Sequence, residues 1–155
     1  MKLTDALDMQ GRLTLQKRDV RATLVEEIVA DNAIVFTGRE LVAKRFVDTP
    51  VDPISHLALG SGDTPVNPAT DTQLAHEIFR KKIESIEVTP TADAQHAKVT
   101  LTVELDFHEA NGELREAGLF NAADPERSVM YNRVVFPVIS KTTDFQLTLV
   151  WDITF

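Results

Sequence analysis

The sequence predicts a mainly β protein, an antiparallel sandwich or sheet of about seven to eight strands with one principal helix at about residues 37–47. Three observations support this fold class. Residues 99–107 and 145–155 alternate apolar and polar side chains with a period of two, as half-buried strands do. Polar segments rich in Gly, Pro, Asn and Asp separate the apolar runs, as turns do. A helical spacing of apolar residues occurs clearly only once, before Pro50.

The N-terminal part is expected to form a hairpin of residues 11–18 and 21–30, followed by the helix. Thr37 and Glu40 have the spacing of a capping box at the start of this helix. Phe36, just before the cap, is expected to pack as a hydrophobic staple. The helical stripe that is expected to run along the core consists of Leu41, Val42, Arg45 and Phe46.

A short strand over residues 54–59 is expected to lead into a loop over residues 60–71. This loop holds two glycines and two prolines and is about a dozen residues long, near the upper limit for a connection without regular structure. Such loops are usually functional or are ordered by a partner, and we expect contacts with other chains to order this one. Thr70 and Gln73 have the spacing of a second capping box, over a short helical turn.

From residue 78 onward the pattern is that of strands. A slip in the alternation near Glu84–Ser85 predicts a bulge. Asn111–Gly112 predicts a tight reversal into a strand that begins at Glu113. Pro137 predicts a strand end, a bulge or an edge position in the next strand. In the final strand Trp151 falls on the apolar face and is expected in the core.

Composition and charge restrict the class of protein. The chain has 155 residues, no cysteine and a net charge of −8. We expect one domain over residues 1–155, with residues 1–9 as a candidate assembly arm. An acidic chain is poorly suited to binding nucleic acid, because counterion release needs clustered basic residues. No apolar run reaches the ~18 residues that a membrane helix needs, and the absence of cysteine suits assembly in a reducing cytoplasm.

The residue patterns predict no catalytic residue, no cofactor and no metal. The four histidines form no ligand pair. The carboxylate pairs Glu104–Asp106 and Glu113–Glu116 could be imagined as an acid pair for sugar hydrolysis. Glu104 and Asp106 share the polar face of a strand, the usual place of solvated charges, and the structural interpretation is favoured. Ser61 stands between two glycines but lacks the pattern of a nucleophile elbow. The basic run at residues 80–82 is interpreted as protection of a sheet edge, with ion pairing to another subunit as the alternative.

Several short motifs occur in one order along residues 32–155. They are Gly38-Arg39 at the helix, L-A-L-G-S-G at 57–62, D-T-Q-L at 71–74, E-A-G-L-F at 116–120, F-P-V-I-S-K at 136–141 and W-D-I-T-F at 151–155. This order resembles a family of small structural proteins of tailed bacteriophages, tail or tail-fibre-associated proteins. Residues 1–31 and 89–97 lie outside the resemblance.

The resemblance implies a non-enzymatic virion component of the tail, baseplate or fibre-attachment region, assembled in the host cytoplasm. Its expected partners are other virion proteins and copies of itself in a trimer or ring. The candidate subunit contacts are Leu3, Leu7, Ser61, Asp63, Thr64, Asp71, Arg80 and Lys82. The alternatives are a neck or head-surface (decoration) protein, a carbohydrate-binding β module that would need an exposed Trp151 or Tyr131, and a small hydrolase that would use Glu104 or Glu116.

Overall fold

The computed structural model describes residues 9–155, and Leu3 and Leu7 lie outside this range. The described chain forms nine antiparallel strands and one helix. The predicted mainly β class is confirmed, with slightly more strands than expected. In chain order the elements are β1 (Gln10–Arg18), β2 (Leu24–Ile34), α1 (Phe36–Lys44), β3 (His56–Gly60), β4 (Glu77–Lys82), β5 (Ser85–Pro90), β6 (Ala97–Leu105), β7 (Gly112–Phe120), β8 (Met130–Lys141) and β9 (Gln146–Thr154). No helix among residues 9–155 is long and apolar enough to cross a membrane.

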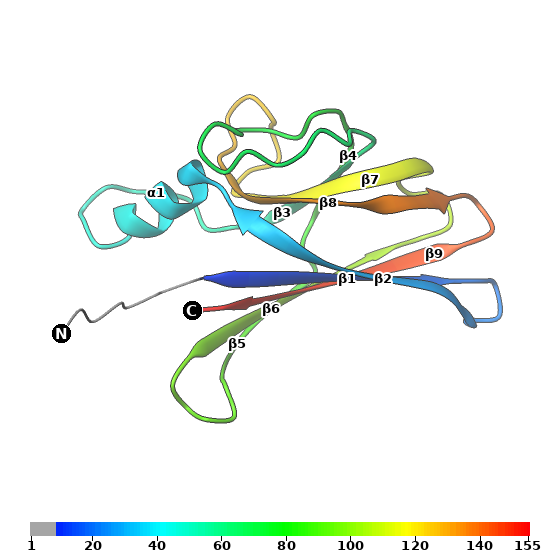
Figure 1. Cartoon of the computed structure of the whole chain (residues 1–155), viewed down its shortest axis with the longest axis horizontal. Coiled ribbons are helices and arrows are strands. Elements are labelled where there is room, and N and C mark those ends of the chain that lie inside the picture. Colours follow the sequence, from blue (N-terminus) through cyan, green and yellow to red (C-terminus); the bar gives the residue numbers. More distant parts are fainter. Residues whose placement is uncertain (1–8) are drawn as a thin grey trace.

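The strands follow the order β4-β3-β7-β8-β2-β1-β9-β6-β5 in a sheet that curls into two layers (Figure 1). The upper layer of Figure 1 contains β4, β3, β7 and β8, and the lower layer contains β2, β1, β9, β6 and β5. Strand β2 joins the layers, because it pairs with β1 along most of its length and with β8 only through Ala33 and Ile34. The final strand β9 lies between β1 and β6 and is therefore central.

The main core lies between the two layers and follows the predicted alternation. Its members from the lower layer are Leu13, Leu15, Leu101, Val103, Leu105, Leu147, Leu149, Trp151 and Ile153, all buried. Trp151 is 1% exposed, and its indole nitrogen donates to the Asn32 side-chain oxygen at 2.6 Å. Gly11 lies opposite Asn32 on the neighbouring strand, where a Cβ atom would lie 1.8 Å from that same oxygen. A side chain at position 11 would therefore displace the Asn32 amide from its place beside Trp151.

A second apolar cluster covers the other face of the upper layer. Ala58, Phe120 and Met130 from three strands pack there against Leu74, which belongs to the connection between β3 and β4. The upper layer is thus buried on both faces, whereas the lower layer is buried on one. The long β3–β4 connection therefore forms a third layer on the outer face of the upper layer.

The helix begins differently from the prediction. The residue at the N-cap is Val35 and no side chain caps the helix. The helix begins at Phe36, so Thr37 lies inside its first turn and the predicted capping box is wrong. The Thr37 hydroxyl donates instead to the Met130 carbonyl at 2.7 Å. Phe36 is 58% exposed and Phe46 is 88% exposed, so neither the staple nor the full apolar stripe forms. Gly38 allows the helix to approach β8, since a Cβ atom there would lie 1.9 Å from the Tyr131 carbonyl oxygen.

Three expected turns also differ. The predicted bulge at Glu84–Ser85 is a break, because β4 and β5 lie in different layers at opposite ends of the strand order. The predicted reversal at Asn111–Gly112 is a corner between layers, since β6 pairs with β5 and β9 and β7 pairs with β3 and β8. No helical turn follows Thr70. The expected irregularity at Pro137 is confirmed, since the β7–β8 register shifts between Val135 and Ile139.

The corner between β6 and β7 is held by a buried lysine. Lys141 is 2% exposed, and its ammonium donates to the Asp106 carbonyl at 2.8 Å and to the Asn111 side-chain oxygen at 2.9 Å. Burial lowers the pKa of Lys141, while Asp106 and Glu109 oppose that shift. Ala110 and Gly112 adopt positive φ angles, 54° and 146°, and turn the chain around this ammonium.

The position of β9 leads to a stability prediction. Leu149→Ala removes a side chain that is 1% exposed in a central strand, and we expect it to lower the free energy of unfolding by roughly 2–5 kcal/mol. Thr148→Ala, on the opposite face of the same strand, is the control and should cost less than about 1 kcal/mol. Urea denaturation of both variants measures the difference. Equal losses would contradict the assignment of the two faces.

Candidate functional site

The candidate site is the connection of residues 61–76, which we call the lid loop. It joins β3 to β4 and lies across the outer face of the upper layer, at the top of Figure 1. It contains no helix or strand. A loop of this length without regular structure needs other partners for its backbone groups. In the lid loop these partners come from the loop itself, from the start of α1, from Glu116 on β7 and from Arg133 on β8.

Glu116 on β7 is fully buried beneath the lid loop. One of its carboxylate oxygens, Oε1, accepts from the backbone N–H of Gly62 at 3.1 Å and of His76 at 2.7 Å. The other, Oε2, accepts from the backbone N–H of Ala75 at 2.9 Å. A single carboxylate therefore binds both ends of the lid loop.

Arg133 on β8 provides the balancing charge and is 2% exposed. Its Nε donates to Oε2 of Glu116 at 2.9 Å, and its Nη1 donates to the Asp71 carboxylate at 3.0 Å. Its Nη2 donates to the Thr64 carbonyl at 3.0 Å. The guanidinium thus joins the strand carboxylate to the middle of the lid loop. Such charge-assisted hydrogen bonds are the stronger ones in proteins, and the fixed fork of Arg also determines their directions.

Glycines leave the space that this buried carboxylate occupies. A Cβ atom on Gly60 would lie 2.5 Å from Oε1 of Glu116, and one on Gly62 would lie 2.6 Å from the same oxygen. On β7, a Cβ atom on Gly118 would lie 2.9 Å from the Asn132 carbonyl oxygen and 3.1 Å from the Leu74 side chain. The L-A-L-G-S-G and E-A-G-L-F motifs are therefore two halves of one packing arrangement.

Further contacts fix the centre of the lid loop. Asp71 accepts from the backbone N–H of Asn67 at 3.0 Å and so closes a turn. The carbonyl of Pro68 accepts from the Phe36 backbone N–H at 2.7 Å, which ties the loop to the start of α1. Contacts inside this chain therefore fix the lid loop, and the contacts with other chains that are expected at this loop stay a prediction.

Ser61 and His76 meet at the base of the lid loop, with the Ser61 hydroxyl 2.5 Å from Nδ1 of His76. A serine nucleophile needs a base that a third group orients and free donors for the developing oxyanion. The nearby backbone N–H groups are occupied: that of Ser61 donates to the His76 carbonyl and that of Gly62 donates to Glu116. Among the described residues, no group bonds to the other ring nitrogen of His76. This pair therefore closes the base of the loop.

The predicted contact residues fall into two groups. Asp63, Thr64 and Lys82 expose their side chains, whereas Ser61 and Asp71 bond within the lid loop or to Arg133. Arg80 is also used internally. It pairs with Glu77 at 2.6 Å, donates to the Ala122 carbonyl at 2.9 Å and stacks over the Phe120 ring at 4.0 Å. Arg80 is therefore a packing residue and does not present its charge to a neighbour, because its guanidinium is bonded to its own subunit.

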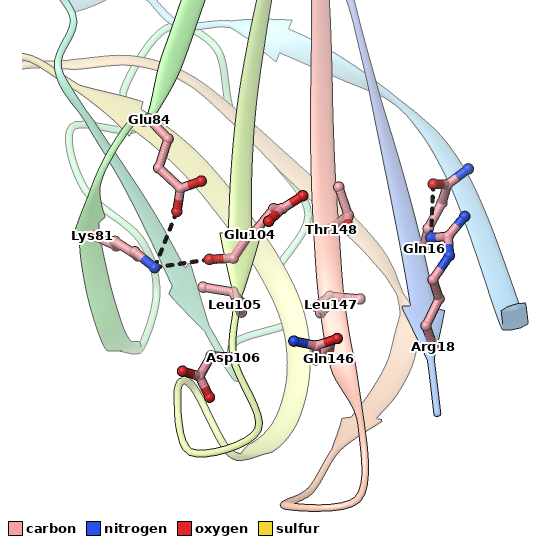
Figure 2. A pocket seen from close by; sticks show the side chains of 10 residues that line it. All are labelled: Gln16, Arg18, Lys81, Glu84, Glu104, Leu105, Asp106, Gln146, Leu147 and Thr148. Atoms are coloured by element: carbon pink, nitrogen blue, oxygen red, sulfur yellow. Dashed lines mark hydrogen bonds and ion pairs between the residues drawn. The ribbon is translucent and has the colours of Figure 1, made fainter. Parts of the chain in front are cut away.

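A polar groove of about 570 Å³ crosses the outer face of the lower layer (Figure 2). Lys81 reaches into it from β4 and donates to the Glu104 carbonyl at 2.8 Å, where β6 has lost its pairing with β5. The same ammonium lies 3.2 Å from Glu84 and 2.9 Å from Glu109. The hydrogen bond from Lys81 lowers the pKa of Glu109, partly offset by burial. Lys81 thus covers an open strand edge, in agreement with edge protection as the role of the basic run.

The other carboxylates and the histidines do not converge. Glu104 and Asp106 are exposed, and Glu113 is exposed three positions before the buried Glu116. No group of three His, Cys, Asp or Glu side chains among residues 9–155 is placed to hold a metal ion. Sequence reasoning considered Glu116 as a candidate acid beside Glu113 and did not identify Arg133. The sequence feature that could have indicated a buried group here is the pair of glycines on both sides of Ser61, because such glycines often allow another group to lie close to the backbone.

No family model, curated protein or solved structure matches this chain. The site is therefore interpreted from its own chemistry.

The buried carboxylate gives a sharp stability prediction. Glu116→Gln keeps the shape but removes the charge opposite Arg133, and we expect it to lower the free energy of unfolding by roughly 3–5 kcal/mol. Glu113→Gln changes an exposed carboxylate on the same strand and should cost less than about 1 kcal/mol. Chemical denaturation followed by tryptophan fluorescence measures both. Similar small losses in the two variants would show that the ion pair does not hold the lid loop.

Proposed function

We propose that this chain is a non-enzymatic structural component of a tailed bacteriophage virion, in the tail, baseplate or fibre-attachment region. It acts through contacts with other virion proteins and with copies of itself. The observation that supports this proposal best is spatial. Three of the motifs that carry the resemblance to phage structural proteins, at 57–62, 71–74 and 116–120, meet where the lid loop packs on β3 and β7.

The geometry of the lid loop suits a contact surface. Its backbone is fixed from below by Glu116 and Arg133, while Asp63, Thr64 and Gln73 point outward and are exposed. A preordered loop loses little conformational entropy when a partner binds, which favours association. Rigid scaffolds that carry ordered loops are a common arrangement for binding surfaces.

The alternative of a carbohydrate-binding module receives less support. Sugar binding commonly uses aromatic rings as stacking platforms, and the chain has one Trp and one Tyr. Trp151 and Tyr131 are 1% and 3% exposed, so neither can serve as a platform. A hydrolase that uses Glu116 is disfavoured as well, because backbone N–H groups and Arg133 already occupy both of its oxygens.

The proposal is tested by locating the protein in particles. Phage particles would be purified on a density gradient from the lysate of a culture that produces the chain. We expect the chain to migrate with tailed particles, and antibody-gold against it to label the tail. Label on the neck or head surface would overturn the tail position. Complete absence from purified particles would overturn the virion role.

A further inference from the structure

The outer edge of β2 has no partner strand within the described residues. β8 pairs with β2 only at Ala33 and Ile34, the C-terminal end of β2. The rest of β2 runs beside β1 and away from β8 (Figure 1). Residues 24–32 therefore pair on one side only. An unpaired edge of this length is a template for another strand unless it is protected.

The backbone N–H and C=O groups of every second residue of β2 point toward this edge. The Val35 N–H, immediately after β2, donates to the Tyr131 carbonyl on β8. Because strand backbone groups alternate in direction, Asp31, Val29 and Glu27 direct theirs toward the same side. Beyond the two residues that pair with β8, that side is open.

The acidic side chains that usually protect such an edge are drawn away from it. Asp31 pairs with Arg12 at 3.2 Å, Glu27 accepts from Gln16 at 2.8 Å, and Glu26 lies 3.8 Å from Lys17. Each of these partners lies directly opposite on β1, on the inner side of β2. The side chains exposed along the edge include Leu24, Val25 and Val29, which are 45%, 49% and 53% exposed, together with Glu27 and Asp31.

From this arrangement we infer that β2 pairs with β2 of a second copy, antiparallel and about a two-fold axis, with Ile28 opposite Ile28. The inference deepens the proposed function, because it names one of the subunit contacts on which that function rests. The two lower layers then join into one continuous sheet. The result is a two-fold dimer, in place of the trimer or ring that the resemblance implies.

Charge selects this register. A two-fold axis perpendicular to the sheet pairs each residue whose backbone groups face the edge with another such residue. Because these residues all have odd numbers, the axis passes through a residue of β2 and not between two residues. Centring on Glu27 would place that carboxylate opposite itself, and centring on Val29 would place Glu27 opposite Asp31. Centring on Ile28 places Val29 opposite Glu27 and Ala30 opposite Glu26, with no acid facing an acid. Like charges directly opposite each other destabilise strand pairs, so the Ile28 register is favoured.

A second copy fits this edge better than the other sheet edges do. The terminal strand β5 ends in Pro90, which has no N–H to donate. On the terminal strand β4, the Arg80 guanidinium bonds to the connection between β7 and β8 through Ala122 and Ser128. The β2 edge is longer than either strand. A self-complementary edge is also what the commonest closed symmetry of soluble oligomers requires.

The experiment is sedimentation equilibrium of the full chain, with two variants of opposite charge at one position. Val29→Glu places a carboxylate opposite Glu27 of the second copy, at two symmetric positions, and should weaken dimerisation by about tenfold. Val29→Lys places an ammonium opposite the same Glu27 and should leave the dissociation constant unchanged or lower it. Val29 is exposed, so both variants should keep the thermal midpoint of the wild type at a protein concentration where all three chains are monomeric, which a melt verifies.

The outcomes separate the two proposals. A wild type that stays monomeric up to about 1 mM would overturn the β2 pairing. Equal weakening by both variants would overturn the register, because it would indicate that residue 29 faces itself. An association that neither variant changes would overturn the use of this edge and leave a virion role intact. Absence from particles would overturn the virion role while a dimer measured in solution would stand.

Discussion

The structure depends on one buried ion pair, between Glu116 on β7 and Arg133 on β8. Without it, the lid loop would leave several backbone N–H groups unpaired over the upper layer, and each unpaired group costs about 1–3 kcal/mol. With it, one carboxylate binds residues 62, 75 and 76, and one guanidinium binds residues 64 and 71. The ion pair also restricts the residue type at positions 60 and 62, because the Glu116 carboxylate fills the space that side chains there would need.

The ion pair gives the sandwich an asymmetry that bears on function. The upper layer is covered on both faces and carries an ordered loop on its outer face, whereas the lower layer ends at an open edge along β2. The first feature presents fixed polar groups at the surface, and the second presents backbone N–H and C=O groups that pair on one side only. Under the proposed function, the ordered loop would bind another virion protein and the open edge would join two copies of the chain.

The sequence predicted best what depends on nearest neighbours along a strand. The alternation in β6 and β9 predicted their buried faces, because one residue in two must face the core. It failed where a distant group intervened. Thr37 looks like a helix cap, but the helix begins one residue earlier, and the Thr37 hydroxyl donates to the Met130 carbonyl on β8. Glu116 looks like Glu113, and only the packing of the lid loop distinguishes a buried carboxylate from a solvated one. The break between β4 and β5 shows in the sequence only as a slip of alternation, which a bulge would also produce.

The most direct test of the central claim is the hydrogen exchange of individual amides in the monomer, at a concentration where no association is measurable. If the ion pair orders the lid loop from within the subunit, the amides of Gly62, Ala75 and His76 will exchange as slowly as those of β7. If these amides exchange as fast as those of the exposed turn at residues 91–96, the loop is not held by its own subunit. In that case the assignment of Glu116 and Arg133 as its anchor is wrong.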